Sequence, residues 1–132
     1  MTLRPSDALA AEDLDWERTI LGGFSQGAVM AYALGLARGR PSPAGIIALA
    51  GYLPDVVALD LEGHRDVPVA IGYGTGDTVI PVERARGARD RLEAAGLAVL
   101  YREGSAFHGI EPVMVHVLQN WLARARSAPD HR

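Results

Sequence analysis

Four short apolar runs, separated by segments with the features of helices, constrain the fold of this chain most strongly. The runs occupy residues 18–24, 44–50, 67–71 and 97–101. None of them alternates cleanly between apolar and polar residues, which is typical of strands buried on both faces of a parallel sheet. The alternation of strand and helix predicts an α/β fold. We expect a mainly parallel sheet of about four strands, flanked by helices and joined by right-handed crossovers.

Helical segments lie before, between and after these runs. They are predicted at residues 6–16, 28–38, 82–95 and 112–126. The second helix ends at Gly39, and the third begins after Pro81 and stops at Gly96, as expected for helices bounded by proline and glycine. Ligands of such sheets bind beyond the carboxyl ends of the strands, so chemistry is expected there.

Composition excludes several classes of function. The 132 residues predict a single domain over residues 1–132, and a formal net charge of -3 offers no broad basic face for nucleic acid. The chain has no cysteine, which excludes disulfides, thiolate metal sites and a cysteine nucleophile. No apolar run is long enough to span a bilayer, and the start of the sequence lacks the apolar core of a secretory signal. A cytoplasmic location is therefore the expectation.

The first run leads into the sequence Gly23-Phe24-Ser25-Gln26-Gly27, directly before a predicted helix. This G-x-S-x-G pattern at a strand–turn–helix junction is typical of a nucleophile elbow. The turn is expected to lift the Ser25 hydroxyl above the sheet and to place the Gln26 N–H where an oxyanion would form. Side chains at Gly23 or Gly27 are expected to crowd the neighbouring strand and helix. The alternative is a glycine-rich turn that matches the pattern by chance.

Two further strand ends supply an acid and a base. The third run is followed by a glycine-rich loop that contains Asp77, and the fourth by a loop that contains His108. Taken alone, Asp77 could equally cap a turn, and His108 could be a solvated loop residue. The chain order Ser25, Asp77, His108 is that of α/β-hydrolases. The three residues are therefore predicted to form a Ser-His-Asp catalytic triad.

Other polar residues are weaker candidates for the site. His64 is expected at the surface between the second and third runs, His116 lies inside the last predicted helix, and His131 is in the tail. Asp55 and Asp60 flank a loop that could border the site, but neither is tied to a strand end. No grouping of His, Asp and Glu has the spacing of metal ligands, and no G-x-x-x-x-G-K phosphate-binding loop is present, so no metal site is expected.

Several segments resemble the phospholipase/carboxylesterase family of α/β-hydrolases, which includes the acyl-protein thioesterases and small bacterial carboxylesterases. The segments are residues 20–28, 48–54, 74–77, 79–81 and 107–109. The F-S-Q-G elbow around Ser25 is the most specific of them, and the similarity extends over residues 15–122. The resemblance implies hydrolysis of carboxylic esters or thioesters without a cofactor. It also implies that Ser25 is the nucleophile, Asp77 the acid and His108 the base.

The chain departs from that family before the elbow. Family members normally have several further strands there, with a His-Gly loop that supplies the second oxyanion donor. This chain resembles the carboxyl-terminal portion of the fold, a truncated α/β-hydrolase without the usual amino-terminal strands. The strand that carries Ser25 is therefore predicted to be an edge with unpaired backbone groups. We expect the N-terminal segment, a second copy of the chain in a homo-oligomer, or a partner fragment to cover it.

The sequence thus predicts a serine hydrolase that cleaves small or short-chain carboxylic esters, with thioesters as a further class. Residues 52–66 form a loop too short for a lid domain, which favours small substrates. The apolar residues of this loop could line an acyl groove or, as favoured here, pack the loop onto the sheet; they are Leu53, Val56, Val57 and Leu59. Two alternatives stay open. One is a catalytically weak or inactive remnant that acts as an interaction module or needs a partner chain, and the other is a gene fragment without an independent role.

Overall fold

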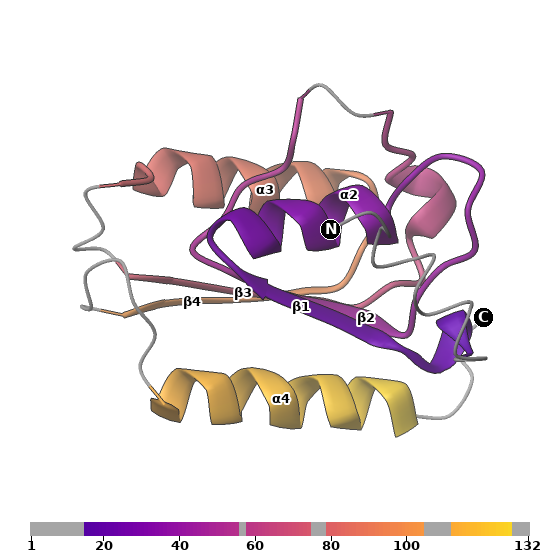
Figure 1. The fold of residues 1–132 in the computed structure, drawn as a ribbon. Helices are drawn as coiled ribbons and strands as arrows, with labels where there is room; N and C mark the ends of the chain where they lie inside the picture. Colours follow the sequence, from indigo (N-terminus) through magenta and orange to yellow (C-terminus); the bar gives the residue numbers. More distant parts are fainter. Residues whose placement is uncertain (1–14, 56–57, 75–78, 105–111, 128–132) are drawn as a thin grey trace, which may run out of the picture.

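The fold was analysed in a computed structural model that describes residues 15–55, 58–74, 79–104 and 112–127 (Figure 1). Its helices and strands alternate along the chain after a short 3-10 turn. They are η1 (Trp16–Arg18), β1 (Ile20–Phe24), α2 (Gln26–Gly35), β2 (Gly45–Leu49), η2 (Glu62–His64), β3 (Val69–Gly74), α3 (Val82–Ala94), β4 (Val99–Gly104) and α4 (Pro112–Ser127).

The four strands form one parallel sheet in the order β1-β2-β3-β4. Helices α2 and α3 cover one face of this sheet, and α4 covers the other (Figure 1). Consecutive strands step in a single direction across the sheet, so crossovers of one hand bring both connecting helices to the same face. The predicted α/β fold with a four-stranded parallel sheet between helices is confirmed.

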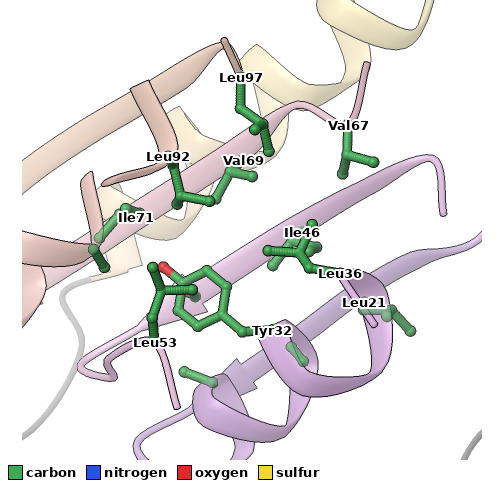
Figure 2. Close-up of a cluster of buried hydrophobic side chains, with 14 residues drawn as sticks. Leu21, Tyr32, Leu36, Ile46, Leu53, Val67, Val69, Ile71, Leu92 and Leu97 are labelled. Carbon is green, nitrogen blue, oxygen red and sulfur yellow. The ribbon is translucent and has the colours of Figure 1, made fainter. Parts of the chain in front are cut away.

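The main core lies between the sheet and the layer formed by α2 and α3 (Figure 2). Tyr32 of α2 and Leu36, the residue after its end, pack near Ile46 of β2, and all three side chains are almost fully buried. A smaller cluster under α4 packs Leu118 against Ala70 of β3. Both faces of the central strands are therefore covered, which explains why their sequences are apolar throughout instead of alternating.

Two of the strands begin and end later than the sequence predicted. The predicted strand 67–71 is β3 at Val69–Gly74, and the predicted strand 97–101 is β4 at Val99–Gly104. Glycine has a low strand propensity, so the sequence favours a loop for the glycines at the end of β3. In the sheet they pair in register with β4, Gly72 opposite Arg102 and Gly74 opposite Gly104. The backbone hydrogen bonds of the ladder override the local preference.

Helix α2 begins earlier than predicted, at Gln26, directly after Ser25, and it ends at Gly35. Trp16 lies in the 3-10 turn η1 and not in a helix over residues 6–16, of which residues 6–14 lie outside the described ranges. In the described ranges no helix combines the length and apolar character needed to cross a membrane.

The prediction that His64 is a surface residue is wrong. His64 is only 4% exposed. Its Nδ1 lies 2.6 Å from the Ser42 hydroxyl, and its Nε2 lies 2.8 Å from the Ala37 carbonyl oxygen. These two hydrogen bonds connect η2 to the segment between α2 and β2. The charged neighbours Arg65 and Asp66, which favour exposure, are themselves exposed, but the polarity of these neighbours does not extend to the histidine.

The loop after β2 packs onto the sheet, as the sequence favours. The structure describes two of the four apolar residues of this loop, and both of them make this contact. Leu53 is 4% exposed within the main core, and Leu59 packs against the same core. Residues 56–57 lie outside the described part of the chain. Leu53 and Leu59 therefore hold the loop in place, and Leu53 also lines a groove between this loop and α3.

Candidate active site

Ser25 occupies a strained turn between β1 and α2. Its backbone angles are φ 58° and ψ -114°, a region that residues with a Cβ rarely adopt. Such a conformation costs about 1–3 kcal/mol and persists only where the surroundings enforce it. The sharp reversal places Ser25 at the carboxyl end of β1 and at the first residue before the helix, which is the backbone setting of a nucleophile elbow.

The Ser25 hydroxyl does not cap its own helix. Serine at this position usually accepts a hydrogen bond from the second or third helical N–H. Here the side chain makes no such bond. The backbone carbonyl of Ser25 accepts the first bonds of the helix, from the N–H groups of Ala28 and Val29 at 3.0 and 3.2 Å, as any N-cap residue does. Side-chain capping of α2 therefore does not explain why this position is a serine.

Gly23 is required by the close approach of β1 to α2. A Cβ built on Gly23 would lie 2.2 Å from both the carbonyl carbon and the oxygen of Gly27, and 2.7 Å from the Ala28 nitrogen. These are backbone atoms, so no side-chain rotation relieves the overlap. A Cβ on Gly27, by contrast, would meet no described atom within 4 Å beyond its own helix. The expected crowding is found at Gly23 and is not found at Gly27 among the described residues.

The neighbouring strand end is strained as well, which the sequence did not indicate. Ala50 has φ 55° and follows β2, as Ser25 follows β1. The Ser25 N–H donates to the Leu49 carbonyl oxygen at 2.7 Å, and the Ala50 N–H donates to the Gly72 carbonyl oxygen at 2.8 Å. Within the described ranges, these two are the residues other than glycine with positive φ. Strain therefore concentrates at the adjacent carboxyl ends of β1 and β2.

Gly51 brings the β2 turn into contact with the elbow. A Cβ on Gly51 would lie 2.4 Å from the Ala28 Cβ and 3.2 Å from the Ser25 carbonyl oxygen. Only glycine allows this approach, so Gly51 joins Gly23 as a residue on which the elbow depends. The short A-L-A-G segment at the end of the second apolar run carries a glycine signal that could have revealed this position.

The Gln26 N–H lies at the N-terminus of α2, directly after Ser25. It has no acceptor among the described residues. An N–H at a helix N-terminus carries part of the positive end of the helix dipole. The backbone therefore offers a donor for a developing negative charge beside the serine.

Asp77 and His108 lie outside the described residues. The strands that lead to them are described. β3 ends at Gly74 and β4 at Gly104, three and four residues before these side chains, and the two glycines are paired across the sheet. Because all four strands are parallel, both loops start from the edge of the sheet where Ser25 lies. The triad itself stays a prediction.

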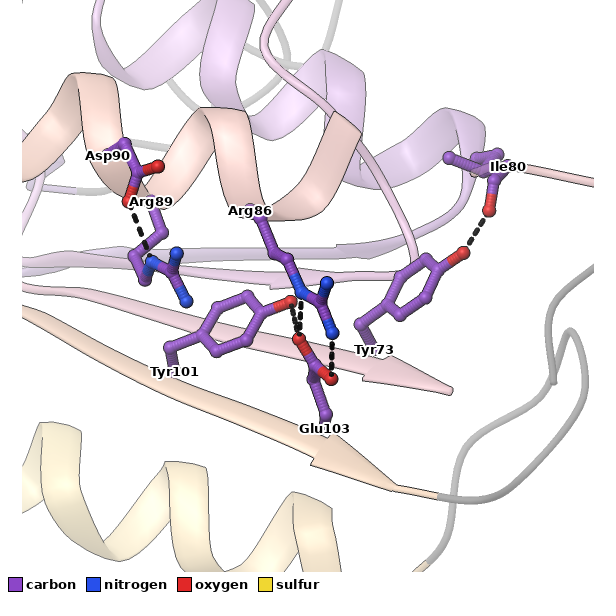
Figure 3. Close-up of polar contacts among 7 residues, drawn as sticks. All are labelled: Tyr73, Ile80, Arg86, Arg89, Asp90, Tyr101 and Glu103. Carbon is purple, nitrogen blue, oxygen red and sulfur yellow. Dashed lines mark hydrogen bonds and ion pairs between the residues drawn. The ribbon is translucent and has the colours of Figure 1, made fainter. Parts of the chain in front are cut away.

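The glycine-rich loop that contains Asp77 is closed at its base by a tyrosine. The buried Tyr73 hydroxyl of β3 donates a hydrogen bond to the Ile80 carbonyl oxygen (Figure 3). The bond joins the residue before Gly74 to Ile80, two residues before α3 begins. It holds Ile80 against the end of β3.

An ionic cluster lies at the end of β4, just before the loop that contains His108 (Figure 3). Arg86 of α3 binds both oxygens of the Glu103 carboxylate, at 2.7 and 3.0 Å, and the Tyr101 hydroxyl donates to the same carboxylate at 2.6 Å. Hydrogen bonding to Arg86, and then to Tyr101, lowers the pKa of Glu103 from 4.5 to about 2. Burial of Tyr101, followed by its bond to Glu103, raises the pKa of that phenol.

Glu103 is expected to make stability depend on pH in the acid range. Because its folded pKa is depressed, its contribution is present above pH 4.5 and is lost as the pH falls toward about 2. Glu103→Gln should lower Tm near neutral pH, and the difference from the wild type should close as the pH approaches 2. The effect is modest because Arg86 is 47% exposed. Thermal melts over this range, with exposed Glu93→Gln as the control, test this; a pH-independent difference contradicts it.

Comparison with known proteins decides the family. A family model described as Phospholipase/Carboxylesterase matches residues 7–125. The chain belongs to this family. Acyl-protein thioesterase 1 of Cryptococcus neoformans is 28% identical over 145 residues, which cover 94% of this chain and 60% of that protein. The chain spans about 60% of the length of this curated relative.

Solved structures agree with this membership. The Bacillus cereus carboxylesterase matches with a TM-score of 0.77 at 19% identity, over 91% of this chain and 56% of that one, and so shows the fold. The structure of esterase PE8 matches with a TM-score of 0.69 at 28% identity, over 91% and 56% of the two chains. This phospholipase/carboxylesterase chain therefore corresponds to part of the α/β-hydrolase structures that it matches.

A groove lies between the loop after β2 and α3 of this phospholipase/carboxylesterase member. It has a volume of about 190 Å³. Its lining includes Tyr52, which directly follows Gly51, and Asp55, one of the loop carboxylates considered from the sequence. The Arg84 guanidinium lies 3.9 Å from the centre of the Tyr52 ring. An oxygen of the Asp55 carboxylate lies 3.8 Å from a guanidinium nitrogen of Arg91. The groove is small and its rim is charged.

Proposed function

We propose that this chain is a serine hydrolase that cleaves small or short-chain carboxylic esters, with thioesters as a second class of substrate. The observation that carries the proposal is the state of Ser25. Its backbone is held at φ 58° between a strand and a helix, and its hydroxyl makes no bond to cap that helix. Strain of this kind at a serine that serves no capping purpose supports a catalytic role.

The reaction is acyl transfer in two halves. Ser25 attacks the ester carbonyl while His108 accepts the hydroxyl proton, and Asp77 holds the imidazole in the required tautomer. The leaving alcohol or thiol takes the proton from His108, which leaves an acyl-enzyme on Ser25. Water then attacks this intermediate with His108 again as the base, and the carboxylic acid is released.

The reach of the two loops supports this arrangement. Neighbouring strands lie about 4.8 Å apart, so β4 is about 14 Å from β1. The four residues from Gly104 to His108 can span up to about 14 Å, and the three from Gly74 to Asp77 about 10 Å. Chain length therefore permits an imidazole and a carboxylate to meet Ser25 above the sheet.

One oxyanion donor is available and a second is needed. The Gln26 N–H, which has no acceptor in the described part of the chain, is the first. Loss of one such donor typically costs about 100-fold to 1,000-fold in turnover. We therefore expect slow turnover unless another segment supplies the second N–H.

The expected substrate size rests on the groove between the loop after β2 and α3, whose lining residue Tyr52 follows Gly51, the residue that contacts the elbow. A volume of about 190 Å³ suits a short acyl or alcohol group. The charged side chains on its rim disfavour a long hydrocarbon chain, because desolvating them costs free energy without a compensating partner. Assays with esters of increasing acyl length should show a maximum at short chains.

Labelling with a fluorophosphonate probe tests the proposed nucleophile without knowledge of the substrate. The wild type should gain one stoichiometric adduct on the peptide that contains Ser25. In the same incubation, Ser25→Ala should gain no adduct on that peptide. Hydrolysis of a short-chain p-nitrophenyl ester should fall in parallel. An unlabelled Ser25 in a folded wild-type protein rules out the assignment.

A partner-dependent enzyme is the second candidate, favoured by the position of β1. The Ala44 N–H donates to the Thr19 carbonyl oxygen, and the Ser25 N–H donates to the Leu49 carbonyl oxygen. The backbone N–H and C=O groups of alternate residues along β1 therefore face β2. The backbone groups of Ile20 and Gly22 point the other way, where no described strand pairs with them. We propose that a second copy of the chain pairs along this edge. Light scattering after size-exclusion chromatography should give a dimer mass; a monomer at assay concentration rules this out.

A further inference from the structure

A second serine of this chain is hydrogen-bonded to a histidine. The Ser42 Oγ lies 2.6 Å from His64 Nδ1, and His64 Nε2 lies 2.8 Å from the Ala37 carbonyl oxygen. A carbonyl oxygen can only accept, so Nε2 carries the proton. In neutral His64 the other nitrogen, Nδ1, is then the acceptor, and the Ser42 hydroxyl donates to it. The tautomer follows from these contacts.

This arrangement has the parts of an activated nucleophile. A hydroxyl donates to an imidazole nitrogen, and a third group holds the imidazole in the tautomer that can accept the proton. We propose that Ser42 is a second nucleophilic serine, reactive toward small activated acyl and phosphonyl esters. Ser42 precedes β2 and Ser25 follows β1. Because these strands are parallel, the two serines lie at opposite ends of the sheet.

The surroundings of Ser42 hold it in place and leave it accessible. Pro41 and Pro43 fix the backbone on either side, since each proline locks its own φ. The Trp16 indole N–H donates to the Pro41 carbonyl oxygen at 2.7 Å. Ser42 is partly exposed, whereas His64 is buried. A small reagent can therefore reach the hydroxyl.

An unused donor is present in the same segment. The Nε of Arg40, two residues before Ser42, is buried and has no hydrogen-bond partner in the described part of the chain. The Arg40 guanidinium lies 5.5 Å from the centre of the Trp16 ring, which restrains it. A buried cationic donor without an acceptor is costly. As part of the proposal, an oxyanion formed at Ser42 is the acceptor that this donor lacks.

The reaction with a fluorophosphonate balances as follows. The Ser42 oxygen forms a bond to phosphorus, the phosphorus–fluorine bond breaks, and fluoride leaves with the electron pair. The hydroxyl proton passes to His64 Nδ1 and then to solvent. With an activated acyl ester, the oxygen bonds to the carbonyl carbon instead, and the leaving alcohol takes the proton from His64.

The experiment uses the Ser25→Ala protein, so it does not depend on the proposed triad. Prolonged incubation with a small fluorophosphonate should give one adduct, which peptide mass spectrometry locates at Ser42. Ser25→Ala/Ser42→Ala should lose this adduct. A positioned general base contributes at least about 100-fold, so Ser42 should react at least about 100-fold faster than an unactivated hydroxyl.

Thr19 supplies the matched control. Its hydroxyl donates to the Asp15 carbonyl oxygen at 2.7 Å. It is therefore hydrogen-bonded like the Ser42 hydroxyl, but its acceptor is a backbone carbonyl and not a basic nitrogen that could take the proton. Thr19→Val in the Ser25→Ala background should leave the adduct unchanged. His64→Gln keeps a donor for Ala37 but removes the base, and should abolish labelling while circular dichroism reports a folded chain. If His64→Gln unfolds, Ser42→Ala carries the test alone. No adduct at Ser42 in Ser25→Ala overturns the proposal.

Discussion

Gly23→Ala is expected to destabilise this chain by about 3 kcal/mol or more, a large part of the stability of a domain of this size. The new Cβ would lie 2.2 Å from two backbone atoms of Gly27. The overlap can be relieved only if β1 separates from α2, which packs Tyr32, and Leu36 directly after its end, into the main core. The strain therefore spreads from the elbow into the core.

Gly27→Ala is the matched control for this prediction. It adds the same methyl group to the same motif, four residues further on, where no described atom lies within 4 Å beyond the helix. Alanine also has a higher helix propensity than glycine, by up to about 1 kcal/mol. Urea unfolding followed by tryptophan fluorescence should show Gly23→Ala far less stable than the wild type, and Gly27→Ala equal to it or slightly more stable. Equal losses in the two variants would contradict the close approach at Gly23.

Ser25→Gly is expected to abolish hydrolysis and at the same time to stabilise the fold. Glycine adopts φ 58° without the strain that a Cβ brings, which removes about 1–3 kcal/mol of cost. The greater freedom of glycine in the unfolded chain offsets about 0.5–1 kcal/mol of this gain. A net stabilisation of about 1 kcal/mol should remain. Loss of the nucleophile should reduce turnover by about three orders of magnitude or more.

Comparison with Ser25→Ala separates the two effects. Alanine removes the hydroxyl but keeps the Cβ, so it should lose the same activity without the gain in stability. Denaturant unfolding and an ester assay on the three proteins provide the measurement. A Ser25→Gly protein that is less stable than Ser25→Ala would show that the turn is not strained. The expected opposition of stability and activity is typical of functional sites that store backbone strain.

The elbow was predictable because its signal is local. Glycines at positions 23 and 27 flank a serine at a strand–helix junction, and this short pattern alone is typical of the sharp turn of a nucleophile elbow. The roles of Asp77 and His108 rest on chain order and on the loops that contain them, and they stay predictions. The phospholipase/carboxylesterase membership expected from the F-S-Q-G elbow is confirmed, whereas the cytoplasmic location remains a prediction.

Contacts between distant segments were not predictable in the same way. Gly51 lies 26 residues after Ser25 in the chain, and only the parallel pairing of β1 with β2 brings the two together. His64 stands among charged residues, yet its ring turns inward to Ser42 and Ala37. A linear sequence reports the polarity of the neighbours of a residue and not the direction of its side chain.

The sequence by itself determined the order of strands and helices, the parallel sheet and the position of the elbow, because these depend on short-range patterns of apolar residues, proline and glycine. The tertiary structure decided the rest: the strain at Ala50 beside Ser25, the need for Gly51, the burial of His64 and the ends of β3 and β4. These features come from strand pairing and from packing across the sheet. Both bring together atoms that are remote along the chain, and no local propensity encodes their distances.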